Sequence, residues 1–204
     1  MSEESIDTRL EAFSDGVFAI AITLLVIDIK LPSSILINTT AEFWLALTHV
    51  APSIFAFLLS FVVILITWVN HRAFLKLVNK SSHSFLYSNG FLLMTVAAIP
   101  FPTALMGEHV LTDHAAPAVV LYNAVIAVQG IAWVLLCDAA LRNHLTRNEQ
   151  STRQMRVNRM HGYFAFIVYG LLAILALWFP LSIAIVTSLT WIFWLIFGIN
   201  IKHE

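Results

Sequence analysis

The chain has 204 residues, of which 59% are hydrophobic and 11% are charged, and its formal net charge is −1. Soluble domains carry about 25% charged and about 45–50% apolar residues, so this composition indicates an integral membrane protein. The net charge gives no support for a nucleic-acid partner. The acidic N-terminus, MSEESIDTRLEAF, lacks the basic region of a cleavable signal peptide, and we expect the first apolar segment to remain in the protein.

The first predicted membrane span covers residues 10–31. A helix needs roughly 20 apolar residues to cross a bilayer. On a helical wheel, several residues of this span fall on one narrow stripe, and two interpretations of that stripe are open. The first is ordinary packing or lipid contact. The other is that several copies of the helix surround an axis, where the stripe forms a hydrophobic constriction that gates by dewetting. At about 100° per residue, this stripe contains Arg9, Phe13, Gly16, Ile20, Thr23 and Ile27, with Leu24 at its edge.

Ser14 and Asp15 lie on a different side of the same helix. A carboxylate inside a bilayer is costly unless it is paired or hydrated, and it normally faces the bundle interior. Trp68 and His71 share a face near the inner end of the second predicted span, 43–71. Their ring N–H groups can donate to Asp15. Two hypotheses stay open: Ser14 and Asp15 cap the helix start, or they join a polar network that fixes the helix in place.

Four further spans complete the predicted bundle. The motif IPFPTAL, at 99–105, predicts a kink near the end of the third span. Pro180 predicts a tight hairpin, because it interrupts an otherwise continuous apolar run. Cys137 is expected to be a small packing residue. The four spans are predicted at residues 84–106, 116–141, 160–179 and 181–200.

Lysines and arginines predict the orientation, because they are enriched in cytoplasmic loops. With the N-terminus in the cytoplasm, ten of the eleven fall on the inner side and only Lys30 falls outside. Both termini are therefore expected in the cytoplasm. The inner residues are Arg9, Arg72, Lys76, Lys80, Arg142, Arg147, Arg153, Arg156, Arg159 and Lys202. The outer loops carry Glu42, Glu108, Asp113, His109 and His114.

Two stretches of the sequence match motifs of a known family. RLEAFSD, at 9–15, resembles the RxxxFSD signature that opens the first helix of the transmembrane protein 175 potassium-channel family. Trp68-x-x-His71 is similar to the motif near the end of that family's second helix. The resemblance extends over the whole chain in architecture, and its most specific part is the first helix.

The resemblance implies an all-α integral membrane protein with six transmembrane helices, a prokaryotic single-repeat member that forms a homotetramer around a central pore lined by the first helix. It implies a leak channel for monovalent cations, moderately selective for potassium over sodium, in a prokaryotic plasma membrane. It implies no cofactor and no enzymatic activity; the partners are other copies, cations and membrane lipid. The pore-lining positions are Ile20, Thr23, Leu24 and Ile27. The positions of a structural polar network are Arg9, Phe13, Ser14, Asp15, Trp68 and His71.

Aliphatic rings offer no ligand that replaces the hydration shell of a cation, and no TVGYG-like stretch occurs in the sequence. We therefore expect weaker discrimination against sodium than a carbonyl filter gives, with Thr23 supplying one hydroxyl per subunit. The acidic residues of the outer loops either raise the local cation concentration at the pore mouth or form an ordinary solvated face.

Two other classes of function remain alternatives. A proton-coupled or small-solute secondary transporter would use Asp15 and His71 as a protonation relay, although no inverted repeat is visible. A membrane enzyme or metal site would use His109 and His114, which are five residues apart on the outer side. No HExxH motif or nucleophile elbow accompanies these histidines.

Overall fold

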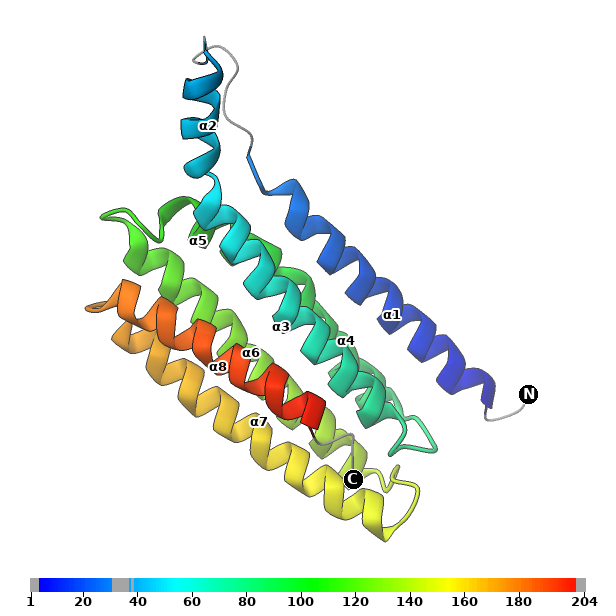
Figure 1. The fold of residues 1–204 in the computed structure, drawn as a ribbon. Helices are drawn as coiled ribbons and strands as arrows, with labels where there is room; N and C mark the ends of the chain where they lie inside the picture. The colour runs from blue at the N-terminus through cyan, green and yellow to red at the C-terminus, as the bar shows by residue number, and fades with distance from the viewer. Residues whose placement is uncertain (1–3, 31–36, 38, 201–204) are drawn as a thin grey trace.

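The computed structural model describes residues 4–30, 37 and 39–200, and the side chains of these residues between 8 and 192. Within this part of the chain there are eight helices; all but α2 form an elongated bundle, and α2 projects beyond one end of it (Figure 1). Lys202, which was expected on the inner side, lies outside the described residues. The helices are α1 (Glu4–Ile27), α2 (Thr40–Thr48), α3 (Ala51–Leu75), α4 (His83–Ala98), α5 (Pro100–His109), α6 (Ala115–Arg142), α7 (Glu149–Leu175) and α8 (Pro180–Asn200).

Prolines divide two of the predicted spans. The expected span 43–71 is shared between α2 and α3, because Pro52 in the first turn of α3 lacks the N–H that would continue the preceding helix. The expected kink in the third span lies between α4 and α5, where Pro100 is the first residue of α5. The predicted hairpin is confirmed, because α7 ends at Leu175 and α8 begins with Pro180.

The start of α7 differs most from the prediction. The helix begins at Glu149, well before the expected start at residue 160, and Asn148 caps it by accepting a hydrogen bond from the Ser151 N–H at 2.8 Å. Its first turns are therefore charged rather than apolar. In the described part of the chain, four helical segments are apolar and long enough to cross a membrane: Thr8–Ile27, Ala51–Leu75, His83–His109 and Ala115–Arg142.

Helix α6 lies at the centre of the packing, against α4, α5, α7 and α8. Its contact with α7 is a close backbone approach. A Cβ atom added to Gly130 would lie 2.8 Å from the backbone nitrogen of Phe166 and 2.9 Å from the carbonyl oxygen of Gly162. Small residues allow membrane helices to approach this closely and gain van der Waals contact. The two glycines therefore set the distance between α6 and α7.

Two loops are joined at the end of the bundle where α1 begins. Val78 and Thr146 form an isolated antiparallel bridge between the α3–α4 and α6–α7 loops. The Arg147 side chain donates from Nε to the Val78 carbonyl at 2.9 Å. Figure 1 shows the first turn of α1 and the last turn of α8 at this same end. The bridge ties the two halves of the bundle together near the residues expected on the cytoplasmic side.

Candidate functional site

One face of α1 is buried in the bundle. Ser14, Phe18, Ala21 and Leu25 are almost fully buried, and their spacing of four, three and four residues is that of a single helix face. This face packs against α3, α4 and α5. The packing accounts for one side of α1 and leaves the others on the surface of the subunit.

The residues predicted to line a pore lie together on the exposed side of α1. Ile20 is 60% exposed, Leu24 41% and Ile27 71%, and Thr23 between them is also exposed. None of the four is used in the core of the subunit. An apolar stripe of this kind on a membrane helix faces either lipid or another copy of the chain.

The hydroxyl of Thr23 has a fixed role within its own helix. Its Oγ1 donates to the carbonyl oxygen of Ile20 at 2.9 Å. A hydroxyl has one proton and two acceptor lone pairs. Because the proton is used in the helix, the oxygen is left as an acceptor toward whatever lies beside the stripe.

Asp15 is held by the second long helix. The Trp68 indole donates from Nε1 to Asp15 Oδ1 at 2.7 Å. The guanidinium of Arg72 lies over the same indole, with its Cζ atom 5.0 Å from the ring centroid, in the geometry of a cation–π contact. Helix α1 thus has a charge-assisted hydrogen bond to α3.

Ser14 joins a second, buried chain of hydrogen bonds that crosses three helices. Asn89 on α4 donates from Nδ2 to Ser14 Oγ at 3.2 Å, and its Oδ1 lies 2.7 Å from His71 Nε2. The His71 ring also packs on Phe18, with centroids 5.5 Å apart. Asn89 was absent from the sequence prediction. Its signal was available, because an amide in the apolar segment LYSNGFLL needs partners as much as Asp15 does.

The structure excludes one of the two hypotheses for Ser14 and Asp15, helix capping, and supports part of the other, the polar network. Helix capping is wrong, because α1 begins at Glu4 and both residues lie well inside it. The polar contacts with Trp68 and Asn89 exist, and they form two separate chains rather than one. Arg9 and Phe13 are exposed, and in the described structure neither makes a hydrogen bond or ion pair with these chains.

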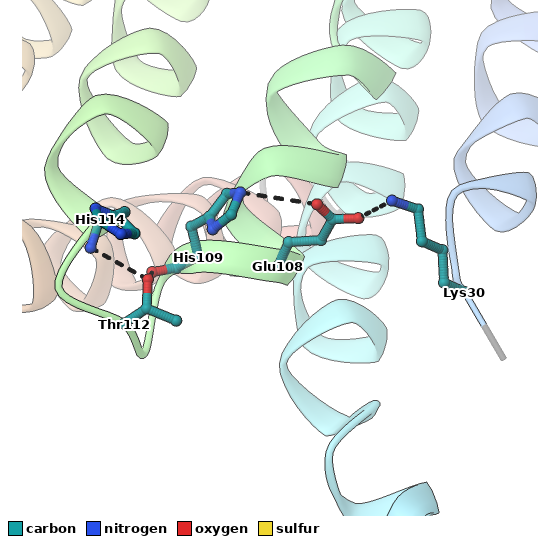
Figure 2. Close-up of polar contacts among 5 residues, drawn as sticks. All are labelled: Lys30, Glu108, His109, Thr112 and His114. Carbon is teal, nitrogen blue, oxygen red and sulfur yellow. Dashed lines mark hydrogen bonds and ion pairs between the residues drawn. The ribbon is translucent and has the colours of Figure 1, made fainter. Parts of the chain in front are cut away.

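The other end of α1 is tied to α5 by an exposed ion pair. Figure 2 shows Lys30 directed toward Glu108, whose second carboxylate oxygen lies 3.7 Å from His109 Nε2. Lys30 donates a hydrogen bond to the Glu108 carboxylate, and this contact raises the pKa of Lys30, so this lysine is charged at neutral pH. The pair connects the C-terminal end of α1, expected on the outer side, to the kinked third span.

Two of the acidic residues expected in the outer loops have partners in the structure. Glu108 pairs with Lys30, and Glu42 accepts a hydrogen bond from the Thr39 N–H in a capping box at the start of α2. His109 and His114 lie close, with ring centroids 6.5 Å apart (Figure 2). No cluster of three or more histidine, cysteine, aspartate or glutamate residues that could hold a metal occurs in the described part of the chain.

Long apolar helices form the bundle, and one of them is fastened by polar contacts on one face and exposes an apolar stripe on another. This arrangement is that of an integral membrane protein. The family model described as endosomal/lysosomal potassium channel TMEM175 matches residues 9–100. A potassium channel of Chamaesiphon minutus is 37% identical over 195 residues, which are 92% of this chain and 94% of that protein. A potassium channel of Streptomyces collinus is 42% identical over 140 residues, which are 68% of this chain and 64% of that protein.

A solved structure shares the fold. The crystal structure of a lysosomal potassium-selective channel TMEM175 homolog from Chamaesiphon minutus matches with a TM-score of 0.77 and 34% sequence identity, and the match covers 93% of this chain and 97% of that one. The chain belongs to the TMEM175 family, whose members are ion channels and not enzymes. It is a multi-pass membrane protein, and its bacterial relatives indicate a plasma-membrane location.

Proposed function

We propose that the chain is one subunit of a homotetrameric leak channel that conducts potassium in preference to sodium, with α1 of each subunit facing a central pore. The exposed apolar stripe of α1 carries this proposal, in a chain related to potassium channels over nearly its whole length. Four copies of the stripe placed around an axis would bury the side chains that a single subunit leaves exposed.

The proposal assigns six membrane crossings to a single domain spanning residues 1–204. Four of them are the apolar segments already described, formed by α1, α3, α4 with α5, and α6. The remaining two are α7 from about residue 160 onward and α8, which are joined by the short turn before Pro180. An even number of crossings returns the chain to the cytoplasmic side, in agreement with the distribution of lysine and arginine.

The pore would combine an apolar barrier with one polar ring. Ile20, Leu24 and Ile27 supply apolar layers, and an apolar constriction resists wetting until it widens. The acceptor oxygen of Thr23, whose proton is donated to Ile20, supplies a partial replacement for water around a dehydrated cation. One hydroxyl per subunit replaces fewer waters than a carbonyl filter, so moderate selectivity is expected.

The polar contacts would hold α1 in register while its other face borders the pore. Trp68 on Asp15, together with Asn89 between Ser14 and His71, fastens the inner half of the helix. Arg9 and Phe13 are exposed in the single chain, and in the proposal they complete their contacts against a neighbouring subunit. The transporter alternative has less support, because Asp15 and His71 have separate hydrogen-bond partners.

The direct test is cation flux from liposomes that contain the purified protein and are loaded with either potassium or sodium. We expect a potassium flux that does not require a proton gradient and a smaller sodium flux. Saturating transport that depends on a proton gradient would favour the transporter, and no potassium flux under any gradient would exclude the channel.

A sharper test changes one ring of the stripe. Ile20→Asn places an amide at the constriction, and we expect a larger conductance with weaker potassium selectivity, because wetting removes the barrier. Ile185→Asn is the matched control, since Ile185 is exposed to a similar degree, 55%, on α8. Equal currents in wild type and Ile20→Asn, with tetramers intact by light scattering, would remove Ile20 from the pore.

A further inference from the structure

Helix α7 has two opposite faces. Its buried face contains Met155, Gly162 and Tyr169, which repeat every seven residues and pack into the bundle. The side chains on the other face are all exposed and fall on one stripe at about 100° per residue. This α7 outer stripe consists of Arg153, Arg156, Met160, Phe164, Ile167 and Leu171.

The chemistry of the α7 outer stripe changes once along its length. It begins with two guanidinium groups one turn apart and is apolar from Met160 onward. From Arg156 to Leu171 the helix rises about 22 Å, which is longer than the roughly 15 Å of hydrocarbon in one leaflet. A cationic end followed by an apolar run of this length matches the headgroup and acyl chains of one phospholipid.

The two arginines of the stripe are not neutralised by the protein. The nearby Arg159 and Arg142 are engaged with Asp138, at 2.8 Å and 3.7 Å. In the described structure Arg153 and Arg156 form no ion pair, although Glu149 lies one turn before Arg153. Exposed cationic clusters at the inner membrane surface attract anionic lipid headgroups.

The position of α7 favours lipid over a second protein. Figure 1 shows α1 and α7 on opposite sides of the bundle. If α1 faces the axis of the assembly, as the proposed function requires, α7 lies on its perimeter. We infer that the α7 outer stripe binds an anionic phospholipid of the inner leaflet, with Arg153 and Arg156 on its headgroup phosphate and the apolar residues along its acyl chains.

Lipid selectivity measures this binding independently of ion flux. The full-length protein is reconstituted in phosphatidylcholine vesicles with trace spin-labelled phosphatidylglycerol or spin-labelled phosphatidylcholine, and the motionally restricted fraction of each probe is compared. We expect a preference for phosphatidylglycerol at the protein surface. Arg153→Gln with Arg156→Gln should lower the affinity of the site by about fivefold per charge removed, and added salt should weaken the wild-type preference.

Two controls separate this site from a general charge effect. Lys76→Gln with Lys80→Gln removes the same charge from exposed residues near the same end of the bundle, away from the stripe, and should leave the preference unchanged. Arg153→Lys with Arg156→Lys should retain most of it. The proposal would be overturned if the double glutamine variant of Arg153 and Arg156 kept the wild-type preference for phosphatidylglycerol. It would also be overturned if the double glutamine variant of Lys76 and Lys80 lost as much of that preference.

A second measurement tests whether protein covers the stripe instead. A nitroxide attached at Phe164→Cys, in a Cys137→Ala background, should be mobile, and oxygen dissolved in the lipid should enhance its spin relaxation. Cys137 is buried, so its replacement removes a competing thiol without changing the surface. A label that is immobilised and shielded from oxygen in the assembled protein would place a neighbouring chain on the stripe and contradict lipid binding.

Discussion

Helices α1 and α7 lie on opposite sides of the bundle and are fastened to it by different means (Figure 1). Helix α7 is held through the close backbone contact of Gly162 with Gly130, which depends on shape along a continuous interface. Helix α1 is held by hydrogen bonds at a few positions in its inner half, around Ser14 and Asp15. Over an 18-residue apolar stretch of the first span, 22% of the residues are buried inside the subunit, against 56% over such a stretch of the central helix α6.

The difference explains how a single chain can combine a stable scaffold with an exposed helix. Helix α6 packs against α4, α5, α7 and α8, so most of its surface is used and little is left for other contacts. A few directed hydrogen bonds fix the rotation and depth of α1 and use only one face. The stripe of Ile20 and Ile27 is thereby left exposed on the single subunit.

The largest effect is expected from the close contact of α6 with α7. Gly130→Val places a branched side chain where a Cβ atom alone would already lie 2.8 Å from the Phe166 backbone. Because backbone must move, we expect a loss of about 3 kcal/mol in stability, seen as a lower midpoint of thermal unfolding in detergent. Gly170→Ala is the control, since nothing lies within 4 Å of its added Cβ. Equal midpoints for the two variants would show that the close contact is not needed.

A smaller loss is expected from the polar attachment of α1. Asn89→Ala removes the side chain between Ser14 and His71 and leaves both buried without that partner. An unsatisfied buried group costs about 1–3 kcal/mol, and we expect about 2 kcal/mol here. Thermal unfolding measures the loss, and light scattering measures whether the proposed tetramer dissociates as α1 is released.

The matched control for this variant is Thr95→Val on the same helix. Thr95 is buried, and its hydroxyl donates to the Leu92 carbonyl within α4. The valine variant should therefore keep α1 attached. If Asn89→Ala and Thr95→Val unfold at the same temperature and retain tetramers equally, Asn89 does not hold α1.

Helical periodicity placed Ser14 and the stripe of Ile20 and Ile27 on different sides of α1, and in the structure Ser14 is buried while the stripe is exposed. The contact of Asp15 with Trp68 was also among the partners expected, since a carboxylate at membrane depth needs a donor, although Asp15 is exposed on the single subunit rather than directed into the bundle. The partner of His71 was missed, because Asn89 reaches it only through the crossing of α4 with α1 and α3. The contact between Gly130 and Gly162 was also missed, because it depends on the register of two helices.

The break between α2 and α3 had a visible signal. Pro52 lies inside the predicted span 43–71, yet hydropathy alone treats the segment as continuous. The sequence contains no comparable signal for the role of the exposed stripe, since an apolar stripe facing lipid and one facing a pore have the same periodicity. Only the resemblance of RLEAFSD, at 9–15, to a channel family made a pore the preferred interpretation.

The smallest effect is expected at the outer end of α1. Lys30→Gln removes the ion pair with Glu108, but the Lys30 side chain is 77% exposed and exposed pairs contribute little to stability. We expect no measurable change in the thermal midpoint. Asp138→Asn is the comparison, because Asp138 is 19% exposed and lies 2.8 Å from Arg159 between α6 and α7, so its loss should lower the midpoint. If Lys30→Gln destabilised the protein as much, the outer end of α1 would be anchored as firmly as the scaffold, and the contrast between the two helices would fail.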